Sequence, residues 1–167
     1  MPFTPFHFGP AVLLKAAAPT RLSLTAFIAT QVAVDCEVLW RAAHHQSPLH
    51  GVWHTGGAAT GVGLAVGAAI HLAAKVLPAS IREQAGPSGR AEWNWTGALL
   101  GGALGGVTHS LLDATMNCDI QPFWPLLSGN PLRAPVGPAV VPCLCVIAGV
   151  GGVIWMLERW SRRGKAG

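Results

Sequence analysis

Apolar residues gather in a few long runs, and polar residues are largely confined to the shorter segments between them. A helix needs about 20 apolar residues to cross the hydrocarbon of a bilayer, at a rise of about 1.5 Å per residue. Three runs are long enough: Thr55–Leu77, Thr96–Thr115 and Pro138–Leu157. A fourth, Leu22–Trp40, is nearly as long and is uninterrupted until Asp35, close to its end. The pattern predicts an all-α fold, a polytopic membrane helix bundle with four spans.

The segment Pro10–Ala18 is apolar apart from Lys15 but is too short to cross a membrane alone. Pro19-Thr20-Arg21 separates it from the next run, because proline interrupts a helix. We therefore expect a short N-terminal helix that forms a hairpin with the first span. A cleavable signal peptide is the alternative, since the segment ends in three alanines. The absence of Lys or Arg before Lys15 argues against it.

The composition favours a membrane protein with one domain, residues 1–167. Hydrophobic residues make up 51% of the chain and charged residues only 11%, whereas soluble domains are about a quarter charged. No CxxC pair occurs among the cysteines Cys36, Cys118, Cys143 and Cys145. We expect them to be small buried apolar residues, with a disulfide or an accessory ligand at Cys36 and Cys118 as the less favoured alternative.

Glycines recur with a spacing of four in two of the apolar runs, for example at Gly63/Gly67 and Gly102/Gly106. Such spacing lets helix backbones approach closely, which drives helix association in lipid. The runs Thr55–Leu77 and Thr96–Thr115 are therefore predicted to pack against each other.

The basic residues are distributed unevenly between the two sides of the predicted bundle. Lys and Arg near the ends of spans mark the cytoplasmic side. Nine fall on one side: Lys15, Arg21, Lys75, Arg82, Arg90, Arg159, Arg162, Arg163 and Lys165. Only Arg41 and Arg133 fall on the other. The asymmetry predicts a multi-pass protein with a cytoplasmic C-terminus, and it explains the basic tail without nucleic-acid binding, which interleaved aromatic residues would indicate.

Ionisable residues stand where a membrane should exclude them, and such residues usually face a partner or a wet cavity. In the predicted topology they meet on the extracytoplasmic side: Asp35, Glu37, His44, His45, His50, His54, His109 and Asp113. His50 and His54 are four apart, as are His109 and Asp113. On helices, each pair would project from one face.

Within this cluster Asp35 offers an oxygen ligand from a third helix, and His7, at the start of the hairpin, would reach the same side. Imidazoles combined with carboxylates suit zinc, or manganese and iron where carboxylates are more numerous. We therefore expect a divalent metal bound by His7, Asp35, His50, His54, His109 and Asp113. Interfacial, hydrogen-bonded histidines are the alternative, and this interpretation is preferred for His71. His44 and His45 lie in a loop outside the paired pattern and are expected either to be solvated or to support the ligands without binding the metal.

An ordered set of motifs resembles the bacterial membrane-bound metal-dependent hydrolases, the family that includes the LexA-binding inner-membrane proteins. The motifs are Phe6-His7-Phe8, Asp35-Cys36-Glu37, His50-Gly51-Val52-Trp53-His54-Thr55 and His109-Ser110-Leu111-Leu112-Asp113, the last followed by Phe123-Trp124-Pro125. The family usually shows His-Arg-Gly-x-Thr-His-Ser, and here the two histidines are one residue closer and the Arg is absent. A more remote likeness to zinc-dependent phospholipase C, an all-helical fold, implies phosphoester chemistry.

The resemblance implies a metal-dependent hydrolase of the bacterial inner membrane with its site on the extracytoplasmic side. A metal-activated water would attack a phosphoester of a lipid or lipid-linked substrate, with Glu37 or Asp119 as general base. The segment Asn117–Gly137, with four prolines, is expected either to cover the cluster or merely to connect two spans. The alternative functions are a non-catalytic metal-binding or ion-transport membrane protein, and a structural membrane protein with interfacial histidines.

Overall fold

The computed structural model describes residues 5–80, 86–133, 137 and 139–164, and the regular structure of these residues is entirely helical. The elements in chain order are the 3₁₀ helix η1 (Pro5–His7), α1 (Phe8–Ala17), α2 (Leu24–Ala43), the 3₁₀ helix η2 (Val52–His54), α3 (Gly56–Ala74), α5 (Gly86–Trp93), α6 (Trp95–Met116) and α7 (Val140–Gly164). The predicted all-α class is confirmed, and α5 is a helix that the apolar pattern did not predict.

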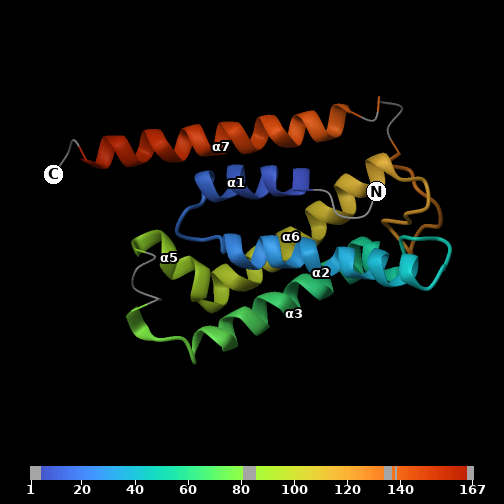
Figure 1. The fold of residues 1–167 in the computed structure, drawn as a ribbon, viewed down its shortest axis with the longest axis horizontal. Coiled ribbons are helices and arrows are strands. Elements are labelled where there is room, and N and C mark those ends of the chain that lie inside the picture. Colours follow the sequence, from blue (N-terminus) through green and yellow to red (C-terminus); the bar gives the residue numbers. More distant parts are fainter. Residues whose placement is uncertain (1–4, 81–85, 134–136, 138, 165–167) are drawn as a thin grey trace.

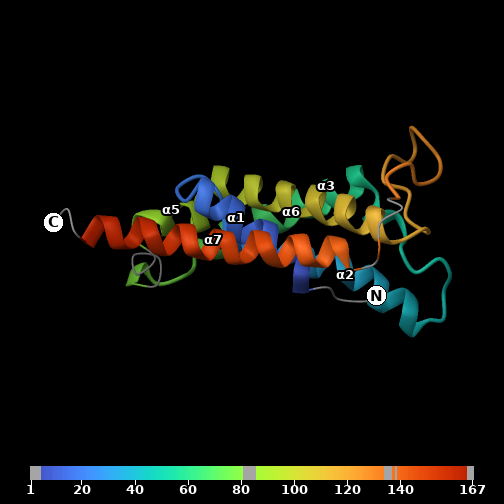
Figure 2. The ribbon, with the colours of Figure 1, turned by 90° about the horizontal axis from the view of Figure 1, so that it is seen from above.

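The helices form layers that lie side by side (Figures 1 and 2). Helices α2, α3 and α6 pack against one another, α1 contacts α2 on one side and α7 on the other, and α7 lies at the edge of the molecule. Helix α1 runs in the opposite direction to α2, as Figure 1 shows. This arrangement brings η1, the C-terminal half of α2, η2 and the C-terminal half of α6 to one end of the bundle.

Polar side chains define where the long helices begin. The side chain of Ser23 accepts a hydrogen bond from the backbone N–H of Ala26, and Thr55 and Asn94 cap α3 and α6 in the same way. Such caps satisfy backbone donors that the helix itself leaves free. Helix α2 continues to Ala43, beyond the predicted end, so Asp35 lies well inside the helix rather than near its end.

Glycine allows the backbones of α3 and α6 to touch. A Cβ atom on Gly63 would lie 2.0 Å from the backbone oxygen of Gly102, and one on Gly106 would lie 2.0 Å from the oxygen of Ala59. No side chain fits in such a space, so only glycine permits this approach. The predicted packing of these two helices is confirmed, since α3 and α6 form the most extensive helix pair.

A buried ion pair between Lys15 and Glu92 joins α1 to α5. The Lys15 ammonium donates to the carbonyl of Leu22 at 2.7 Å and to Glu92 Oε1 at 2.5 Å. Glu92 Oε2 accepts from the Ser23 hydroxyl at 3.1 Å and from the backbone N–H of Thr25 at 3.0 Å. Burial by itself would raise the pKa of Glu92, but these hydrogen bonds hold it below its ordinary value.

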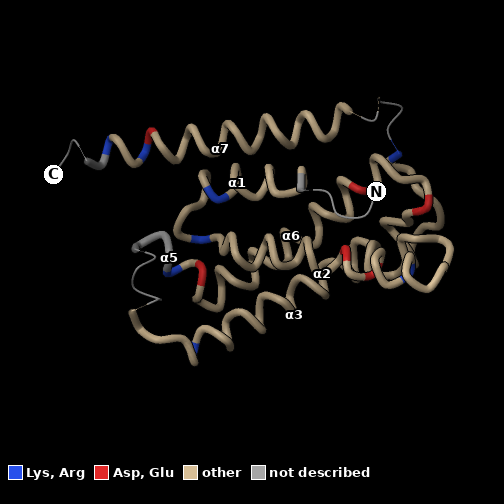
Figure 3. The backbone as a smooth tube through the Cα atoms, in the orientation of Figure 1, with Lys and Arg blue, Asp and Glu red and all other residues tan. Residues whose placement is uncertain are grey.

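Within the described part of the chain, two helices are long and apolar enough to cross a membrane: α3 and residues Val140–Arg162 of α7. Only 22% and 11% of their most apolar stretches are buried within the protein. The other predicted spans, α2 and α6, are not among the candidate spans, so the predicted number of four is not confirmed. Figure 3 shows Lys, Arg, Asp and Glu at the two ends of the bundle, with a long uncharged stretch between them.

The structure corrects two expectations about local features. Residues His50–His54 do not lie on an α-helix: His50 is in a bend and His54 in η2, so their spacing of four does not place them on one helical face. The four cysteines are free thiols, and three of them, Cys36, Cys118 and Cys143, are exposed rather than buried. Arg82 and Lys165 lie outside the described residues.

Candidate metal centre

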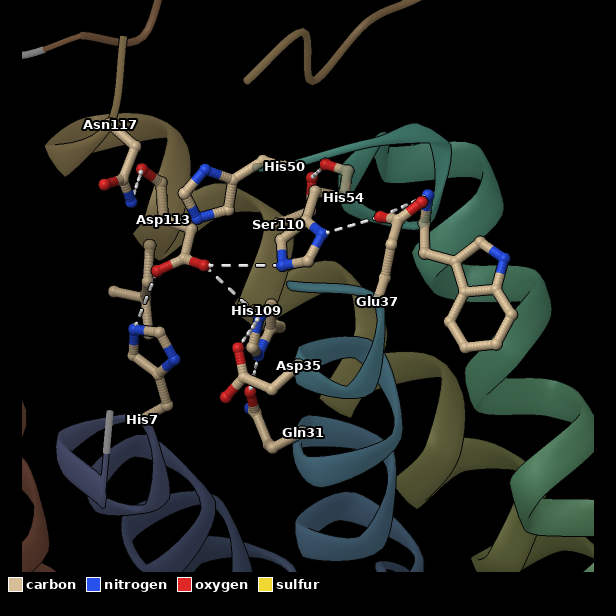
Figure 4. A network of polar contacts seen from close by, with 12 residues as sticks. His7, Gln31, Asp35, Glu37, His50, His54, His109, Ser110, Asp113 and Asn117 are labelled. Carbon is tan, nitrogen blue, oxygen red and sulfur yellow. Dashed lines mark hydrogen bonds and ion pairs between the residues drawn. The ribbon is translucent and has the colours of Figure 1, made fainter. Parts of the chain in front are cut away.

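Four buried side chains from three elements converge at the end of the bundle (Figure 4). Asp35 comes from α2, His54 from η2, and His109 and Asp113 from one face of α6. Each offers one ligand atom, and these atoms all lie within 4.8 Å of one another. The predicted pairing of His109 with Asp113 on one helical face is therefore correct. This group could hold a metal ion, as its residue types and spacing predicted.

The distances between the ligand atoms suit a shared metal better than direct hydrogen bonds. His109 Nε2 lies 3.4 Å from Asp35 Oδ1 and 3.3 Å from Asp113 Oδ2, and His54 Nε2 lies 3.8 Å from Asp113 Oδ2. Charge-assisted hydrogen bonds are shorter, about 2.7–2.9 Å. Ligands about 2.0–2.1 Å from a tetrahedral zinc lie about 3.3 Å apart, close to the separations seen here.

The imidazole nitrogens that face the centre have no hydrogen-bond partner. His54 Nε2 and His109 Nε2 are buried, and neither atom forms a hydrogen bond with the described residues. A buried polar atom without a partner is costly and calls for an explanation. Lone pairs directed at a cation, next to two buried carboxylates, provide one.

The opposite nitrogen of each imidazole is held by a residue outside the group of four. His109 Nδ1 lies 2.6 Å from Gln31 Oε1, and His54 Nδ1 lies 3.0 Å from Glu37 Oε2. Gln31 donates its own N–H to the Thr108 hydroxyl, which turns the amide oxygen toward His109. Each Nδ1 therefore carries the proton in the neutral ring, and each Nε2 lone pair faces the centre, as in many metal sites.

His7 lies beside the centre on the far side of Asp113. Its Nε2 is 3.3 Å from Asp113 Oδ1, whereas His54 and His109 face the other oxygen, Oδ2. The His7 ring is buried, touches His109 edge to face, and has no hydrogen-bond partner for either nitrogen among the described residues. The structure thus brings His7 to the cluster as an additional donor.

His50 and Asp119 form a pair at the rim. His50 Nδ1 lies 2.8 Å from Asp119 Oδ1, and the backbone N–H of His50 donates to Asp119 Oδ2 at 3.2 Å. The His50 ring contacts the His54 ring edge to face, with centroids 4.8 Å apart. His50 is therefore next to the group of four, but its Nδ1 is engaged with Asp119. Burial would raise the pKa of Asp119, and the hydrogen bonds from His50 lower it below its ordinary value.

Glu37 joins the loop before α3 to α2. Its Oε2 atom accepts hydrogen bonds from the backbone N–H groups of Gly51 and Trp53 at 3.1 and 3.0 Å, in addition to His54 Nδ1. Ser110 supports the same segment by donating to the carbonyl of His54 at 2.7 Å. These contacts favour a positioning role for Glu37 over the predicted role of general base.

Burial makes the two histidines from the 3₁₀ helices poor bases. Burial lowers the pKa of His7 below its ordinary value despite the nearby Asp113. It lowers the pKa of His54 as well, although the hydrogen bond to Glu37 opposes this. Both imidazoles are thereby kept neutral near pH 7, which is the form that binds metal.

Sequence reasoning missed the supporting residue Gln31. A signal was present, because Gln31 is a polar residue inside an apolar run and stands four residues before Asp35, on the same face of α2.

Comparison of the chain with protein-family models, with curated proteins and with solved structures finds no match.

Proposed function

We propose that this protein is a membrane-bound metal-dependent hydrolase that acts on a phosphoester of a lipid or lipid-linked substrate. The observation that supports it best is the buried group Asp35, His54, His109 and Asp113, whose ligand atoms lie within 4.8 Å of one another. Its nitrogen and oxygen donors suit zinc, with manganese or iron as alternatives. A divalent metal there would supply a water acidic enough to attack near neutral pH.

The surrounding residues have distinct roles in this proposal. Gln31 and Glu37 orient His109 and His54, so that both Nε2 lone pairs face the metal. Asp119 lies outside the buried group, is partly exposed and holds His50 by two hydrogen bonds. Asp119 is the better placed of the two predicted general bases, because its side chain is 30% exposed against 13% for Glu37, whose Oε2 atom accepts three hydrogen bonds.

The exposed apolar surface supports a location in the membrane. Helix α7 exposes a row of large apolar side chains: Val140, Leu144, Val146, Ile147, Val150, Val153, Ile154, Trp155, Leu157 and Trp160. A soluble monomer rarely exposes such a continuous apolar patch. We infer that α2 and α6 span the bilayer together with α3 and α7, with α1 beside them as the short half of a hairpin.

The charge distribution supports the proposed orientation. Lys15 and Arg21 lie where α1 leads into α2, Lys75 follows α3, Arg90 is in α5, and Arg159 and Arg162 are in the last turns of α7, all at the end opposite the candidate centre. The end with the centre carries Arg41, in the last turn of α2, and Arg133, after α6. Basic residues are retained on the cytoplasmic side. The C-terminus is then cytoplasmic and the centre faces the outside of the bacterial inner membrane. Ion transport is disfavoured, because the Lys, Arg, Asp and Glu positions of the described residues lie toward the two ends of the bundle and leave a long uncharged stretch between them (Figure 3).

Metal analysis followed by a turnover assay tests the proposal. Detergent-solubilised wild type should contain stoichiometric zinc, manganese or iron, and Asp113→Ala should lose it while Asp119→Ala, outside the buried group, keeps it. The metal-loaded wild type should release phosphate or an alcohol from at least one member of a panel of phospholipids and lipid-linked phosphates. Bound metal without turnover on any class would reduce the protein to a metal-binding module, and absence of metal would refute the centre itself.

A further inference from the structure

A pocket of about 250 Å³ opens beside the candidate metal centre. Its lining includes Arg41 from α2, His50, and three residues that follow α6, namely Asp119, Gln121 and Trp124. Helix α2, the segment before η2 and the segment after α6 thus contribute to one concave surface. Most of the lining is apolar, from residues such as Pro48, Val52 and Trp124, and Arg41, Asp119 and Gln121 add a few polar groups. Pockets that bind small ligands commonly combine an apolar lining with a few polar groups that fix the ligand's orientation.

The pocket is separated from the metal centre by one imidazole ring. His54 and His109 are 0% exposed and Asp113 is 3% exposed, so a substrate would approach the centre from a neighbouring cavity. His50 lines the pocket and contacts the ring of His54. Figure 4 shows the His50 ring on the side of the cluster opposite His7. A phosphoester at the centre would therefore extend its head group past His50 into the pocket.

Arg41 supplies a positive charge to the pocket, and the carboxylate of Glu37 lies near it, since a Cβ atom on Gly51 would contact both side chains. Its Nε donates to the carbonyl of Pro48 at 2.6 Å, which fixes the guanidinium, and no ion pair with Arg41 occurs among the described residues. The carboxylate in the pocket, Asp119, is instead held by the backbone and ring of His50. A fixed guanidinium with free N–H groups recognises phosphate and carboxylate oxygens.

The side chains around Glu37 determine where a second negative charge would lie. Glu37 Oε2 lies 3.0 Å from His54 Nδ1, on the side of the ring that faces away from the centre, and a Cβ atom on Gly51 would contact both Glu37 Oε1 and Arg41 Nη1. The His54 ring and the Glu37 carboxylate therefore stand between the guanidinium and the candidate centre, so an anion at Arg41 is not part of the phosphate that the centre would hold.

We propose that this pocket binds an anionic group on the head of the substrate, so that the enzyme prefers phosphoester lipids whose head group carries a second negative charge a few atoms beyond the scissile bond. The proposal deepens, and rests on, the hydrolase function proposed above. It assigns Arg41 as the residue that determines head-group specificity.

The kinetic test compares two lipids that differ in this second charge. Phosphatidylglycerol phosphate and phosphatidylglycerol are presented in mixed micelles to metal-loaded wild type, Arg41→Gln and Arg133→Gln. The last variant removes an equal charge from the same end of the protein, outside the pocket. Wild type and Arg133→Gln should prefer the bisphosphorylated lipid by about tenfold or more in kcat/KM, the worth of a charge-assisted hydrogen bond. Arg41→Gln should lose this preference, mainly through KM, and Arg41→Lys should retain part of it.

A binding measurement separates failure of the pocket from failure of the hydrolase. Glycerol 1,3-bisphosphate and glycerol 3-phosphate are titrated calorimetrically into the same metal-loaded proteins. Tighter binding of the bisphosphate that depends on Arg41 supports the pocket even if no lipid is hydrolysed, in which case the hydrolase proposal fails. If wild type and Arg41→Gln both hydrolyse lipid with the same head-group preference, the proposed role of the pocket is wrong and the hydrolase proposal stands. Equal metal content in wild type and Arg41→Gln shows that the variant is folded. If Arg41→Gln does not fold, Arg41→Lys is used in its place.

Discussion

Gln31 offers a specific test of how the metal centre is built. The side chain is 2% exposed, and its Oε1 lies 2.6 Å from Nδ1 of His109 without contacting the centre directly. Gln31→Leu preserves much of the side-chain volume but removes the acceptor. The N–H of His109 is then buried without a partner, and the ring loses the contact that keeps its Nε2 lone pair toward the metal.

The expected effect can be estimated from this arrangement. Loss of the hydrogen-bond partner behind a metal-ligating histidine lowers metal affinity about 10–100-fold, or about 1.4–2.7 kcal/mol at 25 °C. Gln31→Glu retains an acceptor oxygen and should lose less affinity. A matched control is Thr30→Val, which removes the buried hydrogen bond from the Thr30 hydroxyl to the carbonyl of Ala26 in the same helix, away from the centre.

The assay is competition for Zn²⁺ between the detergent-solubilised protein and a chromophoric chelator. Thermal unfolding of the metal-free proteins is measured in parallel, so that loss of stability is not mistaken for loss of affinity. If Gln31→Leu binds Zn²⁺ as tightly as Thr30→Val, then Gln31 does not set the orientation of His109 and the reasoning is wrong.

Three further predictions concern packing, pH and the role of Glu37. Gly63→Ala places a Cβ atom 2.0 Å from a backbone oxygen of α6 and should destabilise the protein by about 1–3 kcal/mol or more. The control Gly61→Ala should not destabilise it, because its Cβ atom meets nothing within 4 Å. Equal Tm values for the two variants would contradict the packing of α3 against α6. Because the folded-state pKa of Glu92 lies below its ordinary value of 4.5, its pairing with Lys15 stabilises the fold above that pH and is lost as the pH falls through the lowered pKa. The Tm of the wild type should then fall more steeply in this acid range than that of Glu92→Gln, and parallel curves would count against the ion pair. Glu37→Gln keeps an acceptor oxygen and should retain most turnover, while a loss of about 100-fold with metal still bound would identify Glu37 as the general base instead.

Helices and their contacts were largely predictable because local rules govern them. Long apolar runs form helices wherever backbone hydrogen bonds must be satisfied internally. The glycine spacing of α3 and α6 was sufficient to predict that these helices pack together, since a backbone without side chains is the surface that approaches most closely in lipid. Helix α5 was missed because its eight residues, Gly86–Trp93, are polar and include a proline.

The candidate ligands were also visible in the chain, because ionisable residues in apolar runs are conspicuous. His109 and Asp113 share a helical face through their spacing alone. His50 and His54 have the same spacing, yet a bend and a 3₁₀ helix put His54 in the group of four and direct His50 Nδ1 to Asp119. That difference depends on hydrogen bonds that the carboxylates of Glu37 and Asp119, 17 and 69 residues away in the chain, accept from His54 and His50, and no local pattern encodes it.

The sequence therefore predicts the helical class from the lengths of its apolar runs, and the candidate metal-binding residues from ionisable residue types inside those runs. Both follow from short-range periodicity or composition. Only the folded chain decides which donors meet and which nitrogen of each imidazole faces the centre. It also decides that Arg41 lines a pocket beside the centre. These features depend on contacts such as that between Gln31 and His109, which are 78 residues apart. Such contacts arise from the packing of whole helices, and the sequence of one segment carries no record of the distance to another.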